Sequence, residues 1–182
     1  MTQSRVRLTE LTRAGMVLAI IIVLAFFPGI PVGILPAPLV LQNAGVMLAG
    51  ELLGAKTGTL VMTCFFILVA IGMPFLTGGA GGVAVFFSAS AGYFVGWLFA
   101  PAIIAWIMNV KEQPSWLWEI IAVVVGGVLF INLAGSIGLV FTTHISNLAA
   151  ALIGSMVYIP GDLLKAILCV TISQQLHQAG WR

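Results

Sequence analysis

The feature that most constrains this chain is a series of long apolar stretches interrupted by very few charged residues. Of the 182 residues, 61% are hydrophobic and only 7% are charged, whereas a soluble domain carries about 25% charged residues. A water-soluble fold of this size could not cover its surface with so few charges. The mean hydropathy of +1.18 agrees, so we expect lipid to surround most of the surface. The fold class predicted is an all-α membrane protein.

Six stretches qualify as membrane spans, because a helix needs about 20 mainly apolar residues to cross the bilayer core. We expect them to form one transmembrane substrate-binding domain over residues 1–182. The segment from Thr142 to Tyr158, before the last span, has the spacing of a helix with one apolar face, and we expect it to lie along the membrane surface. The expected spans are Leu11–Phe27, Leu39–Leu53, Thr57–Phe75, Val83–Met108, Trp116–Phe141 and Pro160–Gln178.

The composition also argues against several classes of function. A net charge of +2, without a stripe of Lys and Arg, does not fit a nucleic-acid surface. The sequence holds no Gly-x-x-x-x-Gly-Lys-Ser/Thr motif, so we expect no ATP site of its own. Cys64 and Cys169 both lie inside apolar runs and are interpreted as apolar fillers. We therefore expect no metal site, no cofactor and no catalytic residues.

The basic residues predict how the chain lies in the membrane. In a six-span arrangement all of them except Lys165 fall on one side, and the loops over residues 28–38, 76–82 and 142–159 on the other side hold no Lys or Arg. The positive-inside rule then places both termini in the cytoplasm, in a multi-pass protein of the cell membrane. The basic residues concerned are Arg5, Arg7, Arg13, Lys56, Lys111 and Arg182.

Asp162 and Lys165 are the charged residues that this arrangement places away from the cytoplasmic side. Their spacing of three puts both on one face near the outer start of the last span. A lone cation inside a span costs on the order of 2.5–3.5 kcal/mol, so Lys165 should face the protein interior with a partner. The two residues form either a structural ion pair or an anchor for a solute. In the second case Lys165 holds a carboxylate and Asp162 accepts hydrogen bonds from N–H groups.

A glycine-rich loop and several polar residues near the outer ends of the spans are further candidates. Four glycines within residues 78–82 allow a close backbone approach to a ligand, although a simple flexible turn has the same composition. The amides and hydroxyls suit either a polar ligand or bonds to other helices. The candidates of this group are Gln42, Asn43, Gly79, Ala80, Gly81, Ser90 and Tyr93.

Gly15 and Ala19 form a pair of small residues one helical turn apart in the first span. Pairs of this kind let two helices approach closely in a membrane. They serve either to pack the first span internally or to dock a helix of a partner protein.

Several of these segments together resemble the BioY family, the biotin-specific substrate-binding S components of energy-coupling-factor (ECF) transporters. The most specific match is the stretch from Tyr158 to Ala166. Family members commonly have Gly-Pro-Thr/Ser-Gly before a Gly-Tyr pair, where this chain has Ser88-Ala89-Ser90-Ala91. The other matching stretches are Pro38–Asn43, Ala49–Gly54, Gly78–Gly82 and Ala91–Tyr93.

The resemblance implies a six-helix S-component fold that binds biotin near the extracellular face. It also implies a transmembrane coupling subunit and two cytoplasmic ATPase subunits as partners. The chemistry of biotin fits the candidate residues, because its ureido ring offers two N–H donors to Asp162 and its valerate offers a carboxylate to Lys165. The resemblance therefore implies a transporter subunit and not an enzyme.

Three other functions stay open on the sequence alone. The nearest is an S component for another vitamin or small solute, since composition and topology do not distinguish it. An intramembrane hydrolase would use Ser88 or Ser90 with His144, but no Gly-x-Ser-x-Gly motif is present. A purely structural membrane subunit would leave Asp162 and Lys165 without an explanation.

The predicted topology can be tested by cysteine labelling. Single cysteines at Gly29, Ala80 and Ser146 should react with a membrane-impermeant reagent added outside intact cells, because their loops lack basic residues. Labelling of position 80 only after permeabilisation would contradict the six-span arrangement.

Overall fold

The computed structural model describes residues 2–31, 37–143 and 147–181. These residues form helices and turns without a strand, which confirms the predicted all-α class. His144, Ser146 and Arg182, which entered the sequence analysis, lie outside the described residues. The helices are α1 Thr2–Leu24, α2 Gln42–Ala70, the 3-10 helix η1 Val83–Phe87, α3 Ala91–Met108, α4 Trp116–Val123, the π-helix η2 Val124–Leu129, α5 Phe130–Thr142, α6 Leu148–Ser155, the 3-10 turn η3 Met156–Tyr158 and α7 Ile159–Gln178.

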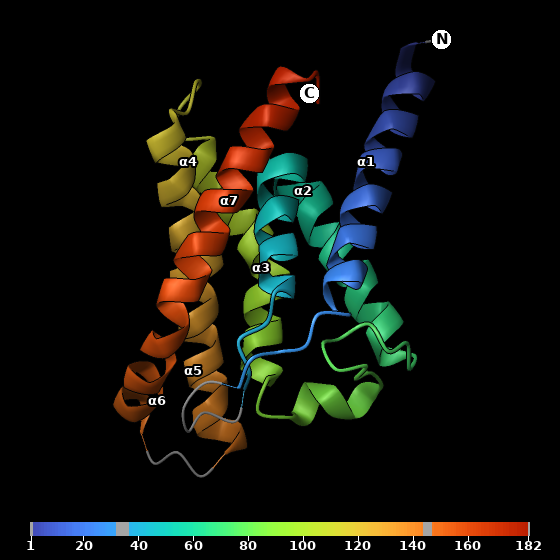
Figure 1. The fold of residues 1–182 in the computed structure, drawn as a ribbon. Coiled ribbons are helices and arrows are strands. Elements are labelled where there is room, and N and C mark those ends of the chain that lie inside the picture. The colour runs from blue at the N-terminus through green and yellow to red at the C-terminus, as the bar shows by residue number, and fades with distance from the viewer. Residues whose placement is uncertain (1, 32–36, 144–146, 182) are drawn as a thin grey trace.

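The long helices lie side by side in a bundle, with the start of α1 and the end of α7 at the same end (Figure 1). Four helical stretches of the described residues are long and apolar enough to cross a membrane. They confirm a multi-pass membrane protein, although they are four in number and the sequence predicted six spans. The stretches are Gln42–Ala70, Ala91–Met108, Trp116–Thr142 and Leu148–Gln178.

Helix α2 accounts for part of the difference, because it contains the second and third expected spans. Gly54, in its middle, has φ 73° and ψ −177°, a conformation open to glycine but not to residues with a Cβ. A Cβ built on Gly58 would lie 2.7 Å from the carbonyl oxygen of Ala49, although nine residues of a straight helix cover about 13.5 Å. The chain therefore reverses at Gly54, at the end of the bundle that holds the termini (Figure 1).

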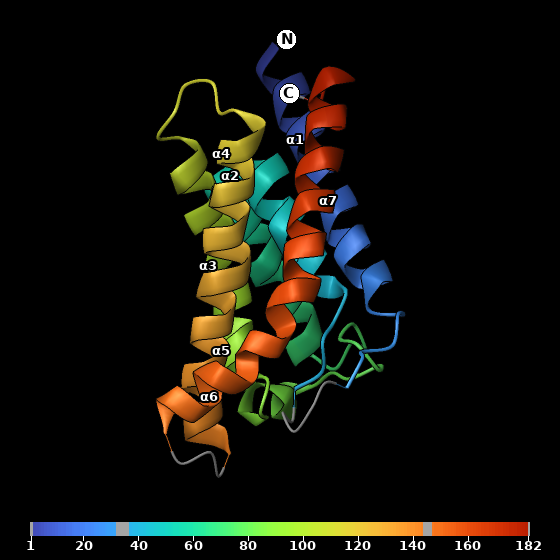
Figure 2. The same ribbon diagram turned by 60° about the vertical axis from the view of Figure 1, so that its left-hand side comes forward.

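Two expected boundaries are corrected by the structure. The fourth span does not begin at Val83, because η1 occupies Val83–Phe87 and the extended backbone of Ser88 (ψ 175°) separates it from α3. The expected surface helix over 142–158 is reduced to α6, and the Asn147 side chain accepts a hydrogen bond from the N–H of Ala150 (2.8 Å) at its start. Figure 2 shows α6 meeting α7 at a bend, so this segment leads directly into the last span.

Helices α3 and α5 pack with their backbones almost in contact. A Cβ on Gly92 of α3 would lie 2.7 Å from the Cα of Gly138 on α5, which is too close for any side chain. This approach brings Ile131 of α5 and Trp97 of α3 into one buried cluster. The first turn of α3 and the middle of α5 thereby form one wall at the end of the bundle opposite the termini.

The close approach predicts different outcomes for two Gly→Ala substitutions. Gly92→Ala should destabilise the protein by about 1–3 kcal/mol, because the methyl group forces the two backbones apart. Gly15→Ala is the matched control, since no atom of the described residues lies within 4 Å of a Cβ built there. Thermal unfolding of both variants in the same detergent measures the difference, and equal melting temperatures would contradict the packing.

Candidate functional site

A cavity of about 280 Å³ lies at the end of the bundle opposite the termini, between α2, α3, α5, α7 and the two loops that follow α1 and α2. Its volume is close to the lower end of small-molecule pockets, about 300 Å³. Asp162, Asn43, Gln42, Ala80, Ser90 and Tyr93 line it, as the sequence predicted for a site. The described lining does not include Gly79, Gly81 or Lys165. The structure therefore brings together six of the nine predicted site residues.

One side of the cavity is built around the carboxylate of Asp162, which is only 4% exposed. Lys165 Nζ donates to Asp162 Oδ1 at 2.6 Å, and Asn43 Nδ2 donates to the same oxygen at 3.3 Å. The other oxygen, Oδ2, accepts from Asn132 Nδ2 at 3.4 Å. The carboxylate is thus held by donors from α2, α5 and its own helix.

Asn132 is a polar residue of the cavity that the sequence analysis missed. It lines the cavity and is buried. The signal that could have found it is an amide inside an otherwise apolar span, since polar residues in spans rarely lack a role. It follows the π-helix η2, and helices of this type occur frequently at functional sites.

The orientations of the two asparagines leave acceptors at this side of the cavity. Asn43 Nδ2 also donates to the carbonyl of Gly127 (3.4 Å), and Asn132 Nδ2 to that of Val128 (2.9 Å). Their donor groups are thereby used, while both Oδ1 atoms are buried without a hydrogen-bond partner among the described residues. Asp162, Asn43 and Asn132 thus make this side of the cavity rich in hydrogen-bond acceptors, the groups that pair with N–H donors.

Lys165 lies behind this surface and not on it. It is 7% exposed, and besides Asp162 its ammonium group donates to the carbonyl of Val40 at 2.8 Å. On the same helical segment, the hydroxyl of Tyr158 donates to the carbonyl of Ala37. The start of α7 thus fastens the loop that follows α1. Direct contact between Lys165 and a ligand carboxylate stays a prediction.

Gln42 lines the cavity, but its amide is occupied by the protein. Its Nε2 donates to the carbonyls of Ile21 (3.1 Å) and Phe75 (2.8 Å). Its Oε1 accepts from both the backbone N–H and the hydroxyl of Thr77, each at 3.0 Å. Gln42 therefore holds the loop after α2 in place, and its predicted contact with a ligand stays a prediction.

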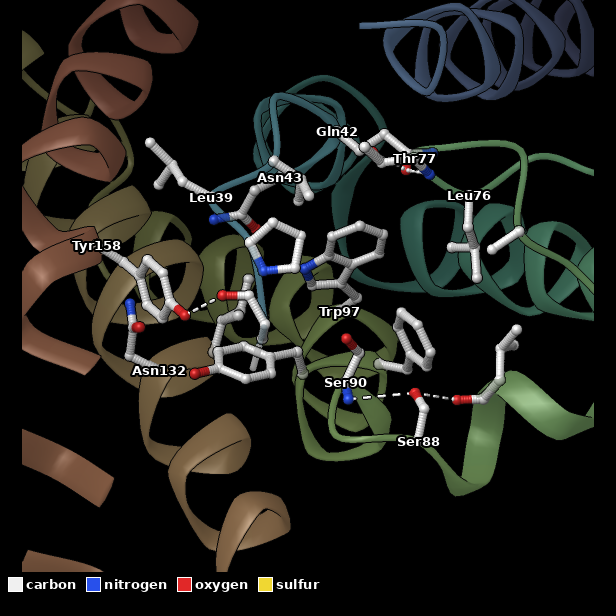
Figure 3. Close-up of a pocket in the computed structure, with 18 of the residues that line it drawn as sticks. Leu39, Gln42, Asn43, Leu76, Thr77, Ser88, Ser90, Trp97, Asn132 and Tyr158 are labelled. Carbon is white, nitrogen blue, oxygen red and sulfur yellow. Dashed lines mark hydrogen bonds between the residues drawn. The ribbon is translucent and has the colours of Figure 1, made fainter. Parts of the chain in front are cut away.

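The rest of the cavity is an aromatic wall and a set of hydroxyl groups. Trp97 and Phe94 are 4% and 8% exposed and both line the cavity. In Figure 3, Trp97 lies between Asn43, Asn132 and Tyr158 on one side and Ser88 and Ser90 on the other. The Ser88 hydroxyl donates to the carbonyl of Val85 at 2.7 Å and accepts from the Ser90 N–H at 3.2 Å. The cavity thus has an acceptor-rich side, formed by Asp162, Asn43 and Asn132, and a hydroxyl side, formed by Ser88 and Ser90.

Comparison with known proteins decides the family. The profile described as "BioY family" matches residues 1–181. The chain belongs to the BioY family. The resemblance carried by the Tyr158–Ala166 stretch is therefore confirmed.

Among BioY relatives, "Biotin transporter BioY" of Lactococcus lactis subsp. cremoris is 43% identical over 177 residues, which cover 96% of this chain and 93% of the relative. The protein of the same name from Rhizobium etli is 34% identical over 173 residues, covering 91% of each. A crystal structure of the S-component for biotin from an ECF-type ABC transporter is similar with a TM-score of 0.90 and 42% identity. The similarity covers 98% of this chain and 94% of that one, which confirms the S-component fold.

The buried ion pair predicts a non-additive response to substitution. Lys165→Met or Asp162→Asn alone should destabilise the protein by about 3–5 kcal/mol, because each leaves a buried charge without its partner. The double variant should lose much less than the sum of the two. Thermal unfolding of the four proteins without added ligand gives the coupling, and additive losses would show that the two charges do not depend on each other.

Proposed function

We propose that this protein binds biotin in the cavity described above and serves as the substrate-specific subunit of an ECF-type biotin transporter. The observation that carries the proposal is the acceptor-rich side formed by Asp162, Asn43 and Asn132 in a BioY family member. The relatives compared above are named biotin transporters. The protein is a transporter subunit and not an enzyme.

The ureido ring of biotin fits the acceptor-rich side. Its two N–H groups find their acceptors among the carboxylate of Asp162 and the free amide oxygens of Asn43 and Asn132. A buried acceptor without a donor is costly, so a ligand that supplies the donors gains affinity and specificity together. The apolar sulfur ring lies against Trp97 and Phe94, in keeping with pockets lined by aromatic side chains.

Lys165 contributes by holding Asp162, because its ammonium group already has two acceptors in the protein. The ion pair holds the carboxylate in place beside the ligand. The carboxylate of biotin then extends to the hydroxyl side, near Ser88 and Ser90 at the start of α3. A helix of 18 residues presents the positive end of its dipole there, which favours an anion.

We propose six membrane crossings, with α1 and the two halves of α2 as the first three. The start of α1, the turn at Gly54 and the end of α7 lie at one end of the bundle (Figure 1). Lys56 follows that turn, and the cavity opens at the other end, whose loops hold no Lys or Arg. The positive-inside rule then places both termini in the cytoplasm and the cavity at the outer face.

Partner subunits supply the energy in this proposal, namely a transmembrane coupling subunit and two cytoplasmic ATPases. Gly15 and Ala19 of α1 are both exposed. No atom within the described ranges lies within 4 Å of a Cβ built on Gly15, so internal packing does not use it. This supports the docking of a partner helix on that face of α1.

Isothermal titration of the purified protein against a vitamin panel tests the proposal. Biotin should bind and the other vitamins should not. Asn132→Leu should weaken biotin binding by about 1–3 kcal/mol, since a hydrogen-bonded N–H of the ligand loses its acceptor. Ser136→Ala is the control, because Ser136 bonds to Ser155 (3.1 Å) in a buried contact between α5 and α6. Unchanged affinity of Asn132→Leu would contradict the assignment of the ureido side.

Biotin amide separates the two roles of Lys165 in the same titration. If Lys165 acts through Asp162, Lys165→Met should weaken the acid and the amide equally, by roughly 2–5 kcal/mol. A loss confined to the acid would favour the direct contact with the carboxylate that the sequence predicted.

A further inference from the structure

The loop after α2, over residues 71–82, lines one side of the cavity and is called its roof here. One buried side chain joins this roof to the end of α1. Gln42 is fully buried, and its four hydrogen bonds reach two separate segments. Two acceptor bonds and one donor bond hold Phe75 and Thr77 of the loop after α2. The remaining donor bond goes to the carbonyl of Ile21 on α1.

The bond to Ile21 gives a partner to one carbonyl group in the last turn of α1. The last carbonyls of a helix lack partners within it. In the final turn, the N–H of Ala25 bonds to the carbonyl of Ile22 at 3.1 Å, and the carbonyl of Ile21 accepts from Gln42. The geometry of the end of α1 thus depends on a side chain that also holds the roof.

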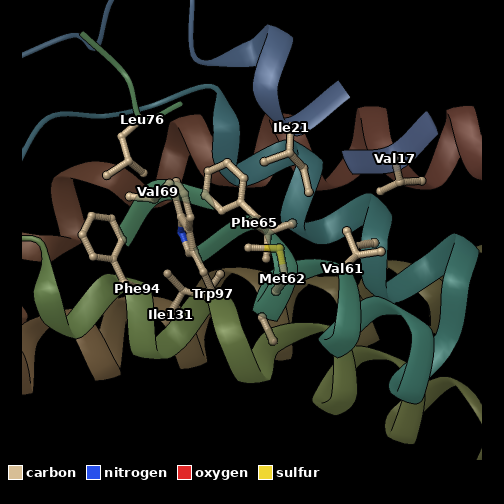
Figure 4. Packing of buried hydrophobic residues seen from close by; sticks show 13 residues of the cluster. Val17, Ile21, Val61, Met62, Phe65, Val69, Leu76, Phe94, Trp97 and Ile131 are labelled. Carbon is tan, nitrogen blue, oxygen red and sulfur yellow. The ribbon is translucent and has the colours of Figure 1, made fainter. Parts of the chain in front are cut away.

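An apolar link runs parallel to this polar one. Leu76, next to Thr77, lines the cavity and belongs to the buried cluster that contains Val17 and Ile21 of α1. Figure 4 shows Leu76, Phe65 and Ile21 within this cluster. A ligand that presses on Leu76 therefore acts on a cluster that includes residues of α1.

We propose that Gln42 is a positioning residue that transmits the occupancy of the cavity to α1, the helix whose exposed face carries Gly15 and Ala19. The inference rests on the proposed function and adds a physical link between its two sites. A ligand under the roof holds Thr77 in place, Thr77 holds the Gln42 amide, and the amide holds the last turn of α1. Coupling of this kind is reciprocal, so a partner that displaces α1 would loosen the roof over the ligand.

Hydrogen–deuterium exchange of the full chain in detergent tests the link. In the parent protein, saturating biotin should slow exchange in peptides covering residues 72–82 and 17–27. The expected slowing is roughly fivefold, because one hydrogen bond changes the population of the open, exchanging state by about that factor. In Gln42→Leu, biotin should slow exchange in 72–82 only. Gln42→Glu keeps the two acceptor bonds to Thr77 but loses both donors, so it should also lose the response in 17–27. Ser136→Ala should respond like the parent.

The outcomes distinguish a failure of the link through Gln42 from a failure of biotin binding. A biotin response at 17–27 that survives in both Gln42 variants, or is missing from the parent although biotin binds, would overturn the role of Gln42. No biotin binding to the parent by titration would instead overturn the proposed function. General destabilisation of a Gln42 variant raises exchange with and without biotin alike, and leaves the difference between the two as the measure.

Discussion

The pairing of Asp162 with Lys165 is the interaction on which the site depends. Both groups are nearly fully buried in a protein surrounded mainly by lipid, where neither charge is stable alone. The ion pair is one helical turn long, yet its remaining hydrogen bonds reach α2, α5 and the loop after α1. Assembly of the bundle is therefore the condition for satisfying the pair, and the satisfied pair fixes the acceptor side of the cavity.

The roof of the cavity is likewise fixed by buried polar groups that find their partners only in the assembled bundle, but here the groups are neutral. Gln42 occupies an apolar environment and meets all four of its hydrogen-bonding positions with backbone and hydroxyl groups of the loop and α1. A buried amide of this kind strongly favours one arrangement of its partners, because every alternative leaves a polar atom unpaired. Lys165 fastens one loop and Gln42 the other. The two loops that line the cavity are thus tied to the bundle by buried side chains, one by Gln42 of α2 and the other by Lys165 of α7 together with Tyr158.

Asn43 and Asn132, beside the cavity, each keep one hydrogen-bond acceptor without a partner among the described residues. Their N–H groups are directed to Asp162 and to the backbone, and their carbonyl oxygens are left over. A ligand with N–H groups supplies the hydrogen-bond donors that these oxygens lack. Under the proposed function, the N–H groups of the ureido ring meet these oxygens, and specificity for a cyclic urea follows from where the oxygens lie.

The sequence by itself determined the membrane class, the basic end and the pair Asp162–Lys165, because charge is so costly in lipid that each charged residue carries positional information. It also predicted several of the residues that line the cavity, since Gln42, Asn43, Ser90 and Tyr93 are polar residues near the ends of apolar runs. Only the tertiary structure decided which of them face a ligand. Lys165 and Gln42 have the right chemistry for a ligand but find their partners in Val40, Ile21 and Thr77, far away in sequence. Asn132 has no charge and no motif, and its role arises only where α5 meets α7, because a hydrogen bond is decided by distances of a few ångströms between helices that the local pattern does not specify.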